Sequence, residues 1–131
     1  LFGEPISIKT VSGASGVKVV WTVDWRKVEE FCRSYEPKSD MLLVQINWGG
    51  EGGLFLTPRE LQQTVFSELG RDAYLRVPKR GTNPRGVEIS WEALRHMLDD
   101  ARTRRIPIRW ERPSIEPLEP YKRWLEHWRE D

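Results

Sequence analysis

The stretch Pro5-Ile6-Ser7-Ile8-Lys9-Thr10 is the most informative part of the chain, because it places a lysine in the middle of a short β-branched run. A run of this kind predicts a strand. A lysine inside an apolar strand is costly to bury, because its ammonium loses water as its neighbours pack. The side chain therefore either extends past the strand to solvent or faces a functional cleft.

The segments that follow this strand favour the cleft, because they alternate between strands and helices. This interleaving predicts an α/β fold with a mixed central β-sheet flanked by helices. Residues 41–47 are largely apolar, which is typical of a strand that is covered on both faces. The expected strands are residues 6–10, 17–23, 41–47, 54–56, 73–77, 86–89 and 106–108, and the expected helices are 25–35, 57–66 and a third that follows Ser90.

Local signals support several of these boundaries. Asp24 and Ser90 are good N-caps, and Thr57-Pro58-Arg59-Glu60 predicts a helix start with a capping box. Four glycines within residues 49–53 predict a turn, and Pro107 predicts an edge strand because it cannot donate to a ladder. Of the seven tryptophans, Trp21, Trp25 and Trp91 fit core positions, whereas Trp48 and Trp128 are not assigned to a core face.

The length of 131 residues predicts one domain. We divide the chain into an α/β domain at 1–112 and a proline-punctuated tail at 113–131, which ends in a short Trp-rich helix with Trp124 and Trp128. The first residue is Leu1 and a strand begins almost at once, so we expect an N-terminal part to be missing from this chain.

Composition excludes some classes of protein. No apolar run approaches the length that spans a membrane, and no signal peptide is visible. The single Cys32 cannot form an internal disulfide and falls on the inward side of its helix, which predicts a buried structural thiol in a reducing compartment, the cytoplasm. His96 and His127 lack cysteine partners at ligand spacing, which argues against a zinc site.

The positive charge is concentrated in patches although the net charge is only +1. The segment 76–85 holds four basic residues and no acid. Within it, Lys79 is suited to phosphate, Arg80 and Arg85 to guanine edges, and Asn83 to adenine. This loop therefore predicts contact with double-stranded DNA, and an ordinary solvated turn is the alternative interpretation.

With its Ser7-Ile8-Lys9 strand followed by a helix and a third strand, the chain resembles the restriction-endonuclease-like superfamily with the PD-(D/E)xK motif. The resemblance covers about residues 5–67 and implies a Mg²⁺-dependent DNA endonuclease with Lys9 as the catalytic lysine. In that family, carboxylates bind Mg²⁺ beside the scissile phosphate, and the lysine stabilises the attacking water or the developing charge. Alternation along a strand places positions 7 and 9 on one face, so both point into one site.

Two departures from the motif are evident. Ser7 stands where the family has an acid, although one branch has Ser-x-Lys and takes its carboxylate from the following helix. By that resemblance Asp24 and Glu29 are the candidate metal ligands, with Glu30 beside them, although their spacing does not match that branch closely. The upstream acid of the motif would lie before Ser7, where Glu4 is too close along the chain, so we expect it on the missing N-terminal part.

Two alternatives stay open. One is a non-catalytic nucleic-acid-binding domain that keeps the basic loop and has lost the acids. The other is a protein-interaction module that uses the Trp-rich C-terminal helix. The partners expected are double-stranded DNA, the missing N-terminal part and a second copy of the chain, with no membrane.

Overall fold

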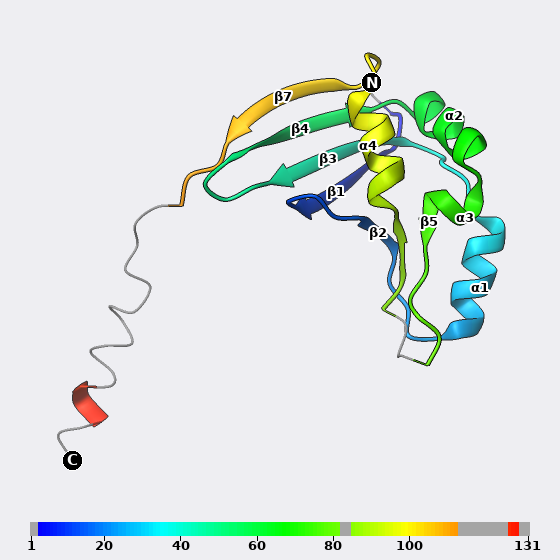
Figure 1. Ribbon diagram of the computed structural model, residues 1–131, viewed down its shortest axis with the longest axis horizontal. Coiled ribbons are helices and arrows are strands. Elements are labelled where there is room, and N and C mark those ends of the chain that lie inside the picture. Colours follow the sequence, from blue (N-terminus) through cyan, green and yellow to red (C-terminus); the bar gives the residue numbers. More distant parts are fainter. Residues whose placement is uncertain (1–2, 82–84, 113–125, 129–131) are drawn as a thin grey trace.

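The computed structural model describes residues 3–81, 85–112 and 126–128 (Figure 1). Strands and helices alternate along most of the chain. In order they are β1 (Ile6–Ser12), β2 (Val17–Val20), α1 (Trp25–Ser34), β3 (Asp40–Ile46), β4 (Glu51–Thr57), α2 (Arg59–Leu69), α3 (Arg71–Tyr74), β5 (Leu75–Arg76), β6 (Val87–Ile89), α4 (Trp91–Asp99) and β7 (Arg104–Arg109).

The strands form two sheets. The larger has the order β1-β3-β4-β7, in which β1 runs parallel to β3 and the other pairs are antiparallel. This is the mixed sheet expected from the sequence, with β7 at an edge as Pro107 predicts. The smaller sheet has the order β2-β6-β5 and is antiparallel; the strands were expected, but their separation into a second sheet was not.

One core joins the two sheets and the helices. The larger sheet contributes only one of its faces, through Val11, Met41 and Leu43, which are all buried. The smaller sheet and the helices supply the rest of the buried apolar side chains. These are Val17, Leu75, Val87 and Ile89 from the sheet, and Val28, Leu61, Val65, Tyr74, Ala93, Leu94, Met97 and Leu98 from the helices.

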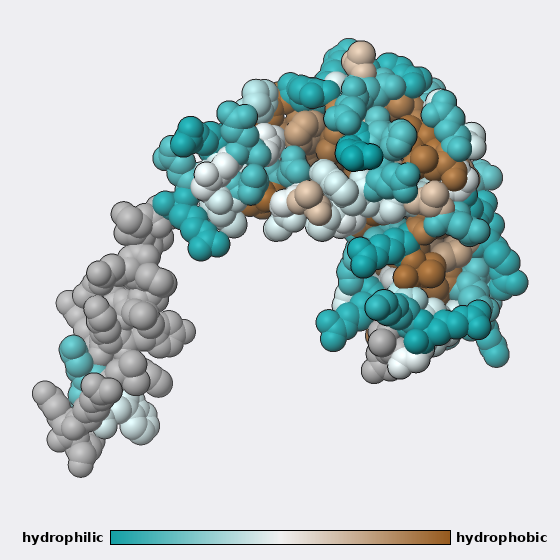
Figure 2. Space-filling view, viewed as in Figure 1, coloured by the Kyte–Doolittle hydropathy of each residue, from teal (hydrophilic) through white to brown (hydrophobic). Residues whose placement is uncertain are grey.

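The molecule is bent. In Figure 1 the four-stranded sheet projects beyond the lobe that carries β2, β5 and α1, and the surface is hollowed beneath it in Figure 2. Among the described residues, every helix is too short or too polar to span a bilayer. Within the predicted tail, only residues 126–128 lie in the described part, in a helical turn; Trp124 lies outside it.

The start of α2 differs from the predicted capping box. Thr57 ends β4 and is fully buried, with its hydroxyl 3.4 Å from the Thr103 hydroxyl, so it does not cap the helix. Asp40 takes that role from the neighbouring strand, because its Oδ1 accepts a hydrogen bond of 2.8 Å from the Arg59 amide. A cap supplied from a distant position leaves no local signature in the sequence. The predicted caps Asp24 and Ser90 are confirmed.

Three further expectations were wrong in detail. Residues 71–74 form a short helix, and only Leu75–Arg76 is a strand. Gly52 and Gly53 lie inside β4, because their missing side chains allow close approach of Trp110 and β7. Trp21 is 65% exposed, because β2 ends at Val20 after a register shift, whereas Trp25 and Trp91 pack against the core as expected.

Candidate functional site

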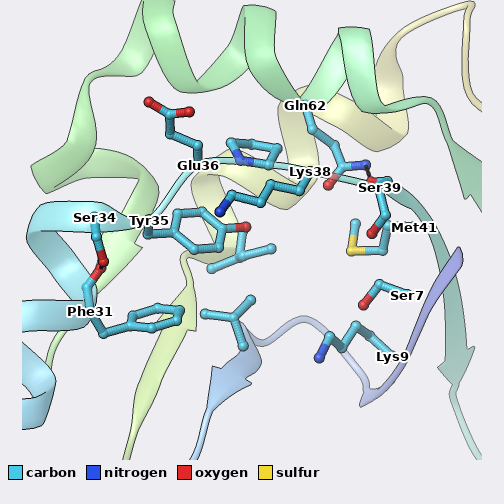
Figure 3. A pocket seen from close by; sticks show the side chains of 13 residues that line it. Ser7, Lys9, Phe31, Ser34, Tyr35, Glu36, Lys38, Ser39, Met41 and Gln62 are labelled. Atoms are coloured by element: carbon cyan, nitrogen blue, oxygen red, sulfur yellow. Dashed lines mark hydrogen bonds between the residues drawn. The ribbon is translucent and has the colours of Figure 1, made fainter. Parts of the chain in front are cut away.

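Lys9 and Ser7 line a cavity of about 310 Å³ between β1 and the segment that connects α1 to β3 (Figure 3). Both side chains are half-buried, whereas Ile6 and Ile8 are exposed on the opposite face of the strand. Alternation along β1 therefore turns the polar pair inward and the isoleucines outward, as the sequence predicts for positions 7 and 9. The remaining lining residues are Val19, Phe31, Ser34, Tyr35, Glu36, Pro37, Lys38, Ser39, Met41, Gln62 and Ile89.

The cavity carries more positive than negative charge. Lys9 and Lys38 both line it, and the only carboxylate among its lining residues is that of Glu36. In Figure 3 the Lys9 amine enters the cavity from β1, whereas the Glu36 carboxylate points away from Lys9. Two ammonium groups facing one space suit a dianionic or polyanionic ligand, such as a phosphodiester backbone.

The wall opposite Lys9 is held by side chains from α2 and α3. Gln62 is 3% exposed and donates to the Ser39 carbonyl at 2.9 Å and to the Thr57 carbonyl at 3.1 Å. Gln63 donates to the Pro37 carbonyl at 3.1 Å. These bonds hold the backbone of the connecting segment against the first turn of α2.

The part of this wall next to the C-terminal end of α1 is held by an arginine and an aromatic cluster. Arg71 donates to the Tyr35 carbonyl at 2.8 Å and to the Cys32 carbonyl, which satisfies carbonyls at the end of α1. The Tyr35 ring lies 5.2 Å from Phe31 and 6.1 Å from Phe66 between centroids. Burial raises the pKa of Tyr35, so its hydroxyl stays protonated at neutral pH. Sequence analysis missed Gln62 and Arg71, because each binds backbone that is remote in sequence.

The predicted metal ligands do not meet Lys9 in the described structure. Asp24 caps α1, accepting a hydrogen bond of 2.9 Å from the Arg26 amide, and Glu29 is exposed on the same helix. Neither lines the cavity, which is reached by the other end of α1 through Phe31 and Ser34. Within residues 3–81, 85–112 and 126–128 no group of three acidic, histidine or cysteine side chains could hold a metal ion.

Cys32 lies on the core side of α1, as predicted, and is half-buried instead of fully buried. Burial raises the pKa of its thiol, so at neutral pH it is less ionised than an exposed cysteine. This is the environment expected of a structural thiol.

The predicted DNA-binding loop lies at the smaller sheet. Lys79, Arg80 and Arg85 are exposed, and Asn83 lies outside the described residues. Arg85 also borders a second, open cavity of about 730 Å³ with Lys18 and Arg76. Sequence analysis did not single out Lys18, because its place beside the loop arises only when β2 pairs with β6.

Contacts within this basic surface hold the loop against β2. The Lys18 Nζ donates to the Arg85 carbonyl at 2.7 Å and lies 4.2 Å from the centre of the Trp21 ring. Gly86 has φ +90°, and a side chain there would meet the Val20 carbonyl at 1.9 Å. The C-terminal end of the loop is therefore anchored at a position that accepts only glycine.

Comparison with known proteins identifies one family. The family model described as "Restriction endonuclease ThaI" matches residues 1–130. A solved structure described as "Restriction endonuclease in complex with substrate DNA" is 46% identical to the chain, with a TM-score of 0.83. That match covers 100% of this chain and 64% of the other, and no curated protein matches. The predicted resemblance and the predicted fold class are both confirmed.

Proposed function

The chain belongs to the restriction endonuclease ThaI family, and from this membership we propose that it acts in the Mg²⁺-dependent hydrolysis of phosphodiester bonds in duplex DNA, with Lys9 as its catalytic lysine. The observation that carries the proposal is the inward direction of Ser7 and Lys9 from β1 into a cavity with two lysines. The relative of known structure, described as bound to substrate DNA, supports DNA as the ligand.

Lys9 has a clear role in this proposal. Its ammonium would contact a non-bridging phosphoryl oxygen or the attacking water, and its charge would stabilise the negative charge that develops in the transition state. Partial burial strengthens this interaction, because fewer water molecules compete for the ammonium. Ser7, one pleat away on the same face, would hydrogen-bond the same phosphate group.

Restriction endonucleases generally use divalent metal ions, but the described residues do not by themselves fit one. A Mg²⁺ site needs one or two well-placed carboxylates, and Glu36 is the single carboxylate that lines the cavity. Asp24 and Glu29 stay a prediction of the sequence, without a described contact to Lys9. Because the chain spans only 64% of its relative, we propose that the metal-binding carboxylates lie in the part of the enzyme without a counterpart here.

The test uses this chain fused to the third of the relative that it does not match. We expect the fusion to cleave duplex DNA with Mg²⁺ and the 131-residue chain alone to be inactive. Lys9→Ala in the fusion should lower the cleavage rate by on the order of 10²–10³-fold, the size of effect seen when one transition-state contact is removed. Thr10→Ala, on the opposite face of β1, is the matched control and should leave the rate unchanged. Cleavage by the Lys9 variant at the parent rate would refute the assignment.

A second candidate function is DNA binding without catalysis, which the serine at position 7 favours. The basic surface formed by Lys18, Arg76, Lys79, Arg80 and Arg85 would then be its main feature. Arg80→Ala with Arg85→Ala should weaken binding to duplex DNA and relax its preference for guanine at the contacted positions. Lys79→Ala should instead lower the salt dependence of the binding constant by about one phosphate contact. Arg59→Ala with Arg26→Ala, on other surfaces, is the control. Retained binding combined with no cleavage by the fusion would favour this second function.

A further inference from the structure

One face of the four-stranded sheet is apolar and uncovered in the described structure. Strand pairing aligns six apolar side chains in two rows across the sheet, Ile8–Leu42–Leu56, which continues to Arg104, and Val44–Leu54–Ile106, which begins at Thr10. We call these six residues the outer face. The opposite face of the same strands carries Val11, Met41 and Leu43, which belong to the core.

The exposure of the outer face is highest at the sheet edges. Ile8 on β1 is 67% exposed and Ile106 on β7 is 61% exposed. The four residues between them are partly exposed, and none of the six packs against the core cluster. The described residues therefore form no buried cluster on this side of the sheet.

This pattern does not fit a surface that remains in water. Soluble monomers rarely expose a contiguous apolar patch of this kind, and a patch on a flat sheet invites aggregation. The strand β3 is apolar on both faces, which is typical of a sheet that is covered on both sides. The sequence of β3 therefore carries a face for which the described chain supplies no cover.

We propose that the outer face is the docking surface for the part of the restriction endonuclease that has no counterpart in this chain, and that this part covers it with the apolar side of one or more helices. The proposal rests on the proposed function. Its occupant follows from length, because all of this chain matches only 64% of its relative. Helices are the expected cover, because a sheet that buries both faces in an α/β domain does so against helices.

The position of β1 supports the same occupant. β1 is an edge strand of the larger sheet. It carries both features that the described residues leave incomplete, which are the site with a single carboxylate and the uncovered apolar face. Its inner face presents Lys9 to a cavity with one carboxylate, and its outer face presents Ile8 to no described partner. A segment that passes this edge would supply carboxylates on one side and an apolar cover on the other.

The experiment is cysteine labelling in a Cys32→Ser background. Ile8→Cys and Ile106→Cys are each made in the chain alone and in the fusion to the unmatched third of the relative, and their reaction with a maleimide is timed. We expect both positions to label on the order of tenfold more slowly in the fusion, as for a site that is buried in the native state. Glu92→Cys, exposed on α4, is the control and should label at the same rate in both proteins.

The possible outcomes separate the occupants. Equal labelling of Ile8→Cys in the chain and the fusion overturns the proposal. Protection in the chain alone that rises with its concentration assigns the face to a second copy of the chain, and also overturns it. Slow labelling in a fusion that cleaves no DNA supports the docking surface while the proposed function fails, because labelling needs no catalysis.

Discussion

The two faces of the four-stranded sheet are built from the same strands and differ in what they contact. The inner face carries Met41 and Leu43 into the core, together with Lys9 at its edge. The outer face carries Leu42 and Val44, which are partly exposed and lie outside the core cluster. Neighbouring residues of equal hydrophobicity therefore differ in burial in the described structure, because they lie on opposite faces of the strand.

Strand β1 departs from the usual relation between polarity and burial. In most half-buried strands the apolar residues face the core and the polar residues face water. In β1, Ser7 and Lys9 face inward and Ile6 and Ile8 face outward. The polar pair on the inner face fits the proposed site, and the apolar pair on the outer face fits the proposed docking surface. Under that proposal, the exposed isoleucines of β1 are covered in the assembled enzyme.

The contrast between the faces is tested most strongly by two neighbouring leucines of β3. Leu43→Ala should lower the free energy of unfolding of the chain by about 2–5 kcal/mol, because Leu43 is fully buried and its removal leaves a cavity. Leu42→Ala, one position away on the outer face, should cost less, about 1–2 kcal/mol, because Leu42 is only partly buried and its loss leaves no enclosed cavity. Urea denaturation measures both. Equal costs would mean that the two faces are equally covered.

A second comparison uses threonines instead of leucines. Thr103 is buried beside the inner face, where its hydroxyl donates to the Met97 carbonyl at 2.6 Å and lies near the Thr57 hydroxyl. Thr103→Val should cost about 1–3 kcal/mol, because it removes a short buried hydrogen bond and leaves the Met97 carbonyl with only the 3.4 Å bond from the Asp100 amide. Thr10→Val, exposed on the outer side of β1, should change the stability by less than about 0.5 kcal/mol. A stability change at Thr10 that matches the change at Thr103 would contradict the distinction.

A third substitution tests a contact that connects the outer side to the helix layer. Asp40 shares its strand side with Ile6, yet its carboxylate accepts the Arg59 amide at the start of α2. Asp40→Ala should lower the free energy of unfolding by about 1 kcal/mol, the usual value for the loss of a helix cap. Asp40→Asn keeps an acceptor and should retain most of the stability. If both variants are as stable as the parent in thermal unfolding, the cap has no energetic role.

The smallest effect is expected at alkaline pH. Burial raises the pKa of Tyr74 above its ordinary value near 10, so the folded state holds the phenol proton more tightly than the unfolded state. The stability from this residue is therefore constant at lower pH and is lost as the pH rises above about 10. Tyr74→Phe should be less sensitive to pH than the parent in urea denaturation at pH 8–11. Identical pH dependence in both proteins would show that Tyr74 does not titrate in this range.

Much of the fold was predictable from sequence because its signals are local. A β-branched run identified β1, apolar content identified β3, and side-chain caps at Asp24 and Ser90 located two helices. The errors fall where a distant residue decides the local structure. Asp40 caps α2 from another strand, and close packing against β7 allows Gly52 and Gly53 to continue a strand where glycines predict a turn.

The site was predictable in part for the same reason. Ser7 and Lys9 follow from alternation within one strand, and the structure places both in one cavity. Lys38, Gln62 and Arg71 reach the cavity or its wall from other elements, and no local pattern marks them. The assignment of Asp24 and Glu29 rested on the family resemblance alone, and the structure brings the C-terminal end of α1, through Phe31 and Ser34, to the cavity that Lys9 lines.

Gly86 has a consequence for how the proposed DNA contacts of the basic loop are redesigned. It fixes one end of the basic loop against the Val20 carbonyl, and the Lys18 bond to the Arg85 carbonyl fastens the neighbouring residue. A cassette of residues 79–84 can therefore be exchanged while the attachment that follows it, at Arg85 and Gly86, is kept. A library that randomises the cassette and keeps Lys18, Arg85 and Gly86 would test the proposed DNA contacts of the loop.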